Sequence, residues 1–286
     1  MRMTSACHAS HARAVAQPEW TSGPDTHRPG QTVPMPTMVA SANILYKLPP
    51  RDARTALTQV LDSRPDLVGL QEWYVSRLRL LRQFGDVRVV PSLGTRLLKR
   101  PKDPAYHWIA SAAAGNVVGA RADRFEPVSS RAVFVSRIGR SDRPDRFLRT
   151  EPPRLVTIGV FRDLTVDRTV AMMSYHLAPG VEVGAEYHPD RPLLRARHEA
   201  EVRRLEQLIA EHHQAGHVVY AVGDSNFDSL RLAGLTSAWE GREHRPGTIG
   251  SRTRKLDDVH GPGRASRVTL LTTPSDHKAV VAVRPD

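Results

Sequence analysis

Consecutive apolar runs in the middle of the chain leave too few residues between them for crossover helices. The runs at 115–120, 131–136, 155–161 and 169–175 are rich in Val, Ile and Phe and are bounded by Gly, Pro and Asp, which is the pattern of β-strands. Parallel strands need a crossover of a dozen or more residues, usually a helix. The spacing therefore predicts antiparallel or mixed pairing and excludes a purely parallel sheet.

Strands and helices alternate on both sides of this middle region. The expected elements are strands at 38–43, 67–70, 218–222, 267–272 and 278–284, and helices at 51–63, 73–83 and 193–214. The most polar internal stretch, 139–153, is too short to be a linker, so we predict one domain over 37–286. Residues 1–36 hold five prolines and no apolar periodicity, which is typical of a disordered tail.

The composition excludes several classes of protein. No apolar run approaches the roughly 18 residues of a membrane span, and no apolar stretch follows Arg2, so a signal peptide is not expected. Cys7 is the only cysteine, which excludes a disulfide framework and cysteine-based zinc sites. These observations favour a cytoplasmic monomer. The net charge of +11 indicates a partner rich in phosphate, either nucleic acid or an anionic lipid.

The positive charge is concentrated in two segments. Residues 77–102 hold eight basic residues against Asp86 alone, and residues 242–267 hold seven against three acids. In the helix at 193–214, by contrast, Arg197 and Glu201 are four residues apart, which is typical of paired surface charge. The unbalanced segment 77–102 is therefore the better candidate for a surface that faces an anion. Its substrate-binding candidates are Arg96, Lys99, Arg100 and Lys102.

Acids, amides and histidines recur at the ends of the predicted strands. They are Asn43, Gln71–Glu72, Tyr175–His176, Gly223–Asn226 and Ser275–His277. One polar residue at a strand end is usually a turn or a cap. Several of them together indicate a site, because strand ends on one edge of a sheet converge in space and sites are built on loops held by rigid elements.

The chemistry of these residues is that of a site for a hard cation. Their carboxylate and amide oxygens are the ligands that Mg²⁺ and Mn²⁺ prefer, and the histidines add groups that titrate near neutral pH. The sequence holds no glycine-rich phosphate loop of the P-loop type. It also lacks a serine nucleophile elbow, because no glycine closes the segment Gly223–Asn226.

Six short motifs, in order, resemble those of the endonuclease/exonuclease/phosphatase superfamily, the group with the deoxyribonuclease I-like fold. They are Ser41–Leu45, Asp66–Glu72, Ser174–Leu177, Gly223–Asn226, Lys255–Asp257 and Ser275–His277. The resemblance implies an α/β four-layer sandwich, with two mixed β-sheets face to face and helices outside. It also implies hydrolysis of a phosphate ester beside a divalent metal, Mg²⁺ or Mn²⁺. Glu72 resembles the principal metal ligand, with Asn43 close by and Asp276 also in contact with metal.

The same resemblance gives roles to the remaining residues. His277 acts on the nucleophilic water or the phosphate and is oriented by Asp257 as an imidazole–carboxylate pair. Asp224 and Asn226 position the nucleophile and the phosphate. His176 donates to a phosphate oxygen as negative charge builds in the transition state.

Two assignments and the substrate stay open. Asp258 is an alternative to Asp257 as the partner of His277, although the alignment of the motif favours Asp257. Arg154, just before the strand at 155–161, is a candidate phosphate contact. The basic run after Glu72 favours a nuclease or other phosphodiesterase that acts on nucleic acid. The alternatives are a phosphomonoesterase, a phosphodiesterase for lipid or inositol headgroups, and a non-catalytic binding module.

Overall fold

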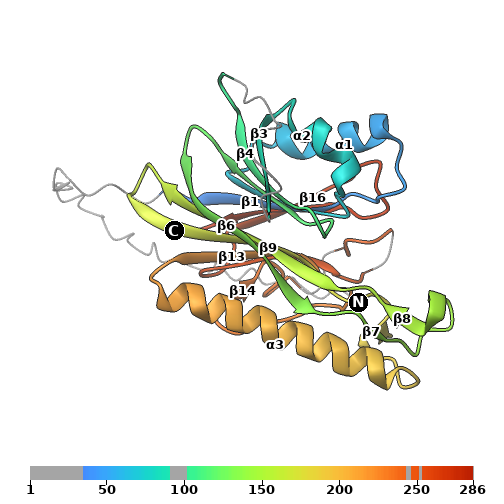
Figure 1. The fold of residues 1–286 in the computed structure, drawn as a ribbon. Coiled ribbons are helices and arrows are strands. Elements are labelled where there is room, and N and C mark those ends of the chain that lie inside the picture. Colours follow the sequence, from blue (N-terminus) through green and yellow to red (C-terminus); the bar gives the residue numbers. More distant parts are fainter. Residues whose placement is uncertain (1–34, 91–101, 243–245, 251–252, 286) are drawn as a thin grey trace, which may run out of the picture. The chain divides into compact units, whose positions relative to one another are not determined.

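The computed structural model describes residues 35–90, 102–242, 246–250 and 253–285 (Figure 1). The predicted tail, except its last two residues, therefore lies outside the described residues. So do Arg96, Lys99 and Arg100. None of the helices in the described part of the chain is long and apolar enough to cross a membrane.

The first sheet has seven strands in the order β16-β17-β1-β2-β5-β4-β3. They are β1 (Thr37–Asn43), β2 (Leu67–Gln71), β3 (Gly85–Val90), β4 (Tyr106–Ser111), β5 (Val117–Arg121), β16 (Arg267–Leu271) and β17 (Ala279–Arg284). β1 runs parallel to β2, and β3 runs parallel to β4, whereas the other neighbours are antiparallel. The sheet is therefore mixed.

The second sheet has six strands in the order β14-β15-β13-β10-β9-β6. They are β6 (Phe125–Ser136), β9 (Arg154–Asp163), β10 (Arg168–His176), β13 (Val218–Asp224), β14 (Thr236–Ser237) and β15 (Asp257–Gly261). Only the β10–β13 pair is parallel among these neighbours. Two short ladders complete the strands: β7 (Gly139–Arg140) with β8 (Thr150–Glu151), and β11 (Glu182–Val183) with β12 (Glu186–Tyr187).

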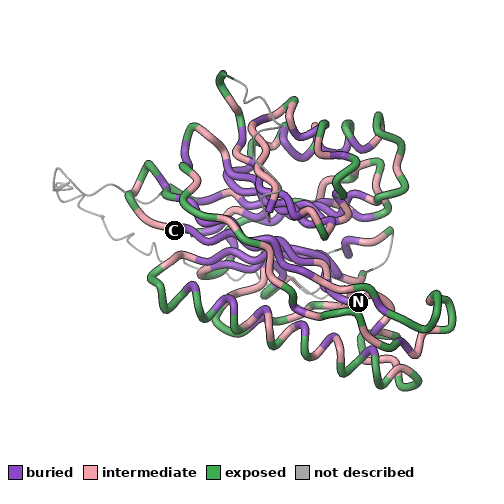
Figure 2. Tube along the Cα trace, in the orientation of Figure 1, coloured by how far each residue is buried: buried purple, intermediate pink, exposed green. Residues whose placement is uncertain are grey.

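The sheets pack face to face, and each has a helix on its outer face (Figure 1). Residues such as Val39, Val118, Met172 and Val222 form the apolar layer between the sheets, where Figure 2 shows buried strands. Helix α1 (Pro50–Asp62) covers the first sheet, and α3 (Pro192–Gln214) covers the second. The predicted four-layer sandwich is therefore confirmed.

The helices cover the sheets because apolar residues recur on one face of each. In α1 the buried positions Ala53, Ala56, Leu57 and Val60 follow the three- and four-residue spacing of one helical face. The buried residues of α3 include Leu205, Leu208 and Ile209, which pack under the second sheet.

The structure corrects several predicted elements. The expected helix at 73–83 is reduced to a 3-10 turn, η1 (Val75–Arg77), and one α-helical turn, α2 (Leu78–Leu81). Strands β3, β4 and β15 were not predicted, because charged and polar residues interrupt their apolar pattern. The polar stretch 139–153 contains the ladder β7–β8 and a second 3-10 turn, η3 (Phe147–Arg149).

Candidate active site

The site lies where the carboxyl ends of two parallel strand pairs, one from each sheet, come together. In the first sheet Asn43 is paired in register with Gln71, at the ends of β1 and β2. In the second sheet His176 is paired with Asp224, at the ends of β10 and β13. The ends of parallel strands are the usual place for a site in α/β sheets. This topology explains why polar residues far apart in the sequence meet here.

A buried polar link joins the two sheets beneath the site. Gln71 Nε2 donates to Ser174 Oγ at 3.1 Å, and Ser174 Oγ donates to the Leu70 carbonyl at 2.9 Å. Gly69 allows the sheets to approach at this level, because a Cβ there would lie 2.1 Å from Val222 Cγ2. These contacts fix the distance between the strand ends that carry the site.

Asp224 is the buried centre of the site. Its Oδ2 accepts a hydrogen bond from Asn43 Nδ2 at 2.9 Å, and its Oδ1 accepts one from the Asn226 backbone N–H at 2.8 Å. Asn226 has a φ of 53° and donates its side-chain amide to the Leu177 carbonyl at 3.2 Å. The carboxylate of Asp224 is therefore held from both sheets.

Glu72 extends from the end of β2 into the site in a left-handed backbone conformation, with a φ of 58°. Its Oε2 accepts a hydrogen bond from the Tyr46 backbone N–H at 2.9 Å. Burial, assisted by Asp224 and Asp276, raises the pKa of this carboxyl above its usual range. Gly115 permits the chain to pass close by, because a Cβ there would lie 3.0 Å from Glu72 Cα. Glu72 thus lies in a region of concentrated negative charge.

His277 is paired with Asp257 and not with Asp258. His277 Nδ1 lies 2.7 Å from Asp257 Oδ2, whereas Asp258 faces away and accepts from Ser237 Oγ at 2.5 Å. Burial acts to lower the pKa of His277, but the charge and hydrogen bond of Asp257, with Asp224, outweigh it and raise the pKa to about 10. The imidazole is therefore held as a cation at neutral pH. Its Nε2 lies 4.0 Å from Asp224 Oδ2.

The pKa of His176 is shifted in the opposite direction to that of His277. Its Nε2 lies 3.6 Å from Asp224 Oδ2. Burial and the nearby Arg154 guanidinium lower the pKa of His176 to about 4. The two histidines on either side of Asp224 therefore differ in charge at neutral pH, with His277 cationic and His176 neutral.

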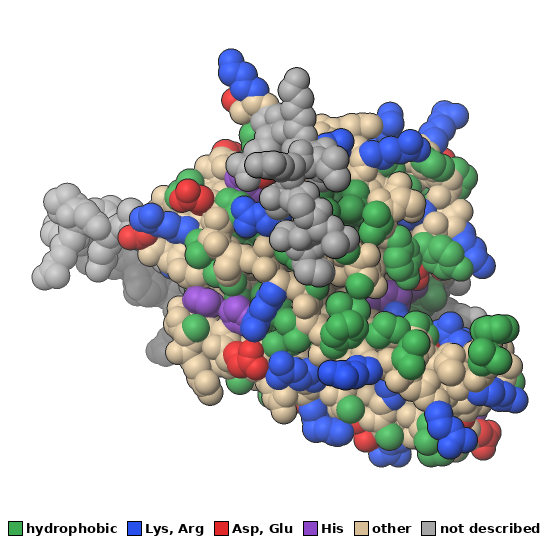
Figure 3. All heavy atoms as spheres, viewed as in Figure 1, with side chains coloured by type: hydrophobic (Ala, Val, Ile, Leu, Met, Phe, Trp, Pro, Cys, Tyr) green, Lys and Arg blue, Asp and Glu red, His purple; other side chains and the backbone are tan. Residues whose placement is uncertain are grey.

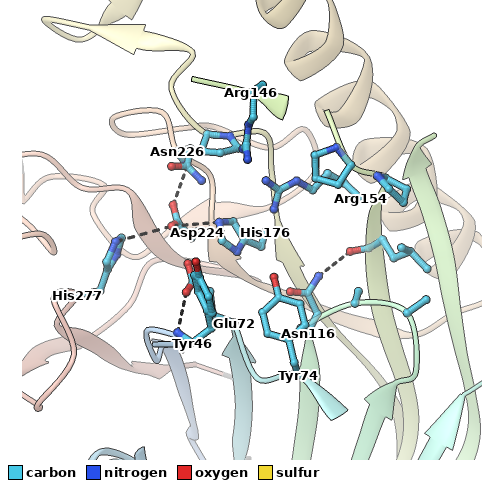
Figure 4. Close-up of a pocket in the computed structure, with 17 residues that line it drawn as sticks. Tyr46, Glu72, Tyr74, Asn116, Arg146, Arg154, His176, Asp224, Asn226 and His277 are labelled. Carbon is cyan, nitrogen blue, oxygen red and sulfur yellow. Dashed lines mark hydrogen bonds and ion pairs between the residues drawn. The ribbon is translucent and has the colours of Figure 1, made fainter. Parts of the chain in front are cut away.

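These groups line a pocket of about 410 Å³ (Figure 4). Of the predicted site residues, it brings together Glu72, Arg154, His176, Asp224, Asn226 and His277. Asn43 and Asp257 are buried behind this lining and contact Asp224 and His277. Asp276 is exposed beside His277, and its charge acts on Glu72.

Arg154 lies in the pocket wall at the first residue of β9. Its Nε is buried and has no hydrogen-bond partner among the described residues. Burial lowers the pKa of this guanidinium, although Glu201 and Tyr74 act in the opposite direction. An arginine with an unpartnered Nε in a concave site is suited to bind a phosphate, because its planar donors match two phosphate oxygens.

Four polar or aromatic lining residues were not among the predicted site residues: Tyr46, Tyr74, Asn116 and Arg146. Tyr74 follows Trp73 in the sequence, but Trp73 is buried and Tyr74 is 45% exposed at the pocket. The ring centroids of Tyr46 and Tyr74 are 6.1 Å apart at an interplanar angle of 85°. Asn116 directly precedes β5, a signal that the sequence analysis did not use, whereas the other three lie in loops and have no strand-end signal.

Two expectations about charged residues need correction. Arg77, counted in the basic run 77–102, is buried and donates to backbone carbonyls of the loop after β1. The Arg197–Glu201 pair is also buried, with Glu201 Oε2 accepting from the Ala178 backbone N–H at 2.8 Å. Both are structural groups within the fold. Lys102 is exposed and does not line the pocket.

Helix α3 supports the site from behind through His198. His198 Nε2 lies 2.8 Å from the Ser225 carbonyl oxygen, and its Nδ1 lies 3.0 Å from Tyr187 Oη. Burial lowers the pKa of His198, so a neutral imidazole that donates from Nε2 fits these contacts. This contact fixes the segment between Asp224 and Asn226.

The donor set fits a hard divalent cation. Asn43 Oδ1 is buried without a hydrogen-bond partner among the described residues, although the amide nitrogen of the same side chain is bonded to Asp224. Glu72 lines the pocket together with Asp224, which Asn43 contacts. Asp224, Asp257 and His277 also have ligand atoms within 4.8 Å of one another. However, His277 is paired with Asp257 and is held as a cation, so Glu72 and Asn43 are the residues that could hold a metal ion.

Comparison with known proteins identifies the fold. No family model and no curated protein matches the chain, whereas solved structures do. An endonuclease/exonuclease/phosphatase of Bacteroides vulgatus matches with a TM-score of 0.60 and 16% identity, over 87% of this chain and 98% of that one. D. rerio TDP2, complexed with a single-stranded DNA product, matches with a TM-score of 0.58 and 15% identity, over 87% and 98%. The chain has the endonuclease/exonuclease/phosphatase fold.

A third protein with the endonuclease/exonuclease/phosphatase fold is the mannosyl-6-phosphatase of Bacteroides thetaiotaomicron. It matches with a TM-score of 0.58 and 15% identity, over 86% of this chain and 98% of that one. The likeness lies in the arrangement of the sheets, and it confirms the fold that the resemblance of the ordered motifs implied. The endonuclease/exonuclease/phosphatase fold places the polar strand ends of this chain at one edge of the sandwich.

Proposed function

We propose that this protein hydrolyses phosphate esters with a bound divalent cation, Mg²⁺ or Mn²⁺, and that its substrate is a nucleic acid phosphodiester. The observation that carries the proposal is one pocket that gathers an acid–imidazole pair, an aspartate with two hydrogen bonds and an arginine whose Nε has no partner among the described residues. Each of these groups has a role in the attack of a water molecule on the phosphorus atom.

Glu72 and Asn43 hold the cation in this proposal, with the exposed Asp276 at the rim. When bound, the ion neutralises phosphate charge and lowers the pKa of water. The raised pKa of Glu72 and the unpartnered oxygen of Asn43 both support this assignment. A cation held by Glu72 and Asn43 would relieve the electrostatic repulsion among the carboxylates of Glu72, Asp224 and Asp276.

The protein's own groups then orient the reaction. Asp224, held from both sheets, orients the attacking water and accepts its proton as the water adds to phosphorus. The cationic His277, fixed by Asp257, donates to a phosphate oxygen, and His176 donates from the opposite side of Asp224. Arg154 binds the remaining phosphate oxygens. The P–O ester bond breaks as the leaving oxygen takes a proton from solvent water, and Asp224 then releases the proton of the attacking water to solvent, which restores the site.

Three observations favour nucleic acid as the substrate. The chain carries a net charge of +11, and exposed Tyr46 and Tyr74 rings stand at the pocket, where a base can stack. A structural neighbour holds a single-stranded DNA product.

A second candidate is hydrolysis of a phosphomonoester. Arg154 lines the pocket with an Nε that has no hydrogen-bond partner among the described residues and suits the additional charge of a terminal phosphate, and one structural neighbour is a mannosyl-6-phosphatase. In this case the substrate would be a small phosphorylated molecule and not a polymer.

A substrate panel with Mg²⁺ tests the proposal. The panel comprises supercoiled DNA, single-stranded DNA, RNA, inositol phosphates, sphingomyelin and a generic phosphodiester. We expect cleavage of nucleic acid and of the generic diester, complete loss of activity in excess chelator, and none in a His277→Ala preparation purified in the same way. Full activity in chelator, or no hydrolysis of any ester, would overturn the proposal. Preferential release of phosphate from the monoesters would favour the second candidate.

A further inference from the structure

An arm beside the pocket presents two large apolar side chains to solvent. The arm is formed by β7 and β8, with Arg140 opposite Thr150 in the ladder. At its apex Phe147 is 83% exposed and Leu148 is 75% exposed. In Figure 1 the arm projects near the start of α3. Exposed apolar side chains at a projecting apex are typical of a contact surface.

The backbone of the apex is strained. Leu148 and Arg149 are consecutive residues in the left-handed region, with φ values of 50° and 51°. This conformation is unfavourable for residues with a Cβ, by roughly 1 kcal/mol or more each. This turn therefore has an unfavourable backbone conformation and also exposes apolar surface. The combination indicates that the apex has a function.

The arm is anchored at its base and is fixed relative to the pocket. Glu151 Oε1 accepts from Ser141 Oγ at 2.7 Å and from Arg146 Nε at 3.1 Å. Arg143 Nη1 donates to the Pro179 carbonyl at 2.9 Å. Arg146 also lines the pocket, as do the residues that follow β8 up to Arg154. An extended ligand bound in the pocket can therefore continue directly onto the arm.

The arm carries an excess of positive charge. Residues 139–151 hold four arginines against three acids. All three acids are engaged: Asp145 with Arg143, Glu151 with Arg146, and Asp142 with the backbone N–H of Leu193 at the start of α3. Arg140 and Arg149 are exposed and make no side-chain ion pair or hydrogen bond with the described residues. They remain available for an anionic partner.

A single-stranded nucleic acid has the chemistry that matches this surface. It repeats one negative charge per nucleotide and exposes flat base faces that stack on aromatic rings. The rings of Tyr46 and Tyr74 at the pocket offer further stacking faces. We propose that the arm Gly139–Glu151 binds single-stranded nucleic acid, with Phe147 stacked on a base and Arg140 and Arg149 on phosphates of the strand in the pocket. This inference rests on the proposed function and specifies its substrate.

Fluorescence anisotropy of a labelled single-stranded oligonucleotide tests the arm directly. Chelator is present so that the full-length protein binds without cleavage. We expect Phe147→Ala and Phe147→Leu to weaken binding at least ~5-fold, because a stacked base is lost, and Phe147→Trp to retain affinity within twofold. The pair Arg140→Gln with Arg149→Gln should flatten the slope of log Kd against log salt concentration by about 1.4.

Leu164→Ala, in the turn between β9 and β10, and Arg162→Gln, near the end of β9, are the matched controls. They should bind as the wild type does, and circular dichroism verifies that every variant is folded. Unchanged affinity of Phe147→Ala, or no binding by the wild type, overturns the proposal. It is also overturned if Phe147→Ala loses binding only to phosphatidylserine vesicles, since the arm would then be a membrane contact. Arm-dependent binding without any ester hydrolysis would instead refute only the proposed function.

Discussion

His277 Nδ1 lies 2.7 Å from Asp257 Oδ2, while the neighbouring Asp258 bonds to Ser237 on the other side of β15. Alternate residues of a strand point to opposite faces, and this explains why two adjacent aspartates have different partners. Only one of them can orient the imidazole. The pair therefore offers a matched comparison within a single strand.

Asp257→Asn should lower turnover by at least ~10², because the imidazole loses the carboxylate that orients it and keeps it cationic. Asp258→Asn is the control: it should lower the free energy of unfolding by about 1–3 kcal/mol with a change in turnover below tenfold. Steady-state kinetics and urea denaturation measure the two effects. Equal losses of turnover in both variants would mean that the catalytic pair is misassigned.

Arg154→Ala should lower kcat/KM at least tenfold, because the phosphate loses a charge-assisted contact in a buried wall. Arg154→Lys should recover part of the loss, since it restores the charge but not the planar donors. Arg203→Ala, an exposed arginine of α3, serves as the control and should keep the wild-type value. If Arg154→Ala also keeps the wild-type value, Arg154 does not contact substrate.

The strand-end residues were predictable from the sequence because sheet topology determines where strand ends meet. Asn43 and Asp224 are 181 positions apart, yet both follow apolar strands that end at the same edge. A periodic apolar pattern identifies such strands, and the polar residue that ends each strand is then visible. The two-sheet architecture was implied by the family resemblance of the ordered motifs, whereas the apolar pattern alone predicted mixed or antiparallel pairing.

Groups whose burial depends on a partner could not be predicted in this way. Arg77 is part of a basic run, yet it is buried because four backbone carbonyls converge on its guanidinium. Strand β15 begins with Asp257 and Asp258, which are buried only because His277 and Ser237 satisfy them. Tyr46 and Tyr74 reach the pocket from loops, where no sequence period applies.

Arg77→Ala should destabilise the fold and the cation site together. The guanidinium donates to four carbonyls of the loop that follows β1: those of Ile44, Leu45, Tyr46 and Leu48. The backbone N–H of Tyr46 in turn holds Glu72. We expect the free energy of unfolding to fall by at least ~2 kcal/mol, measured by urea denaturation. Arg79→Ala, exposed on the adjacent helix, should change the free energy of unfolding little. A similar decrease in both variants would mean that Arg77 has no specific role in holding this loop.

His212 should make stability depend on pH. Burial, with Arg131 and His217 nearby, lowers the pKa of His212 to about 4, whereas the unfolded chain protonates it near about 6.5. Between these pH values the unfolded state binds more protons, so the free energy of unfolding falls as the pH is lowered through the window. His212→Gln should reduce this dependence in urea denaturation at pH 7 and 4.5, and His213→Gln should not. If the free energy of unfolding of His212→Gln depends on pH as strongly as that of the wild type, His212 is not the source of this dependence.

Mg²⁺ should raise the melting temperature of the wild type, because an ion that binds only the folded state stabilises it by mass action. Glu72→Gln should remove most of this response, since Glu72 is the carboxylate that holds the cation in our proposal. Glu186→Gln, an exposed carboxylate on β12, should respond as the wild type does. Differential scanning fluorimetry across Mg²⁺ concentrations measures the shift without relying on turnover. A full Mg²⁺ response in Glu72→Gln would move the cation to Asp224 and Asp257, where His277 would have to release its carboxylate.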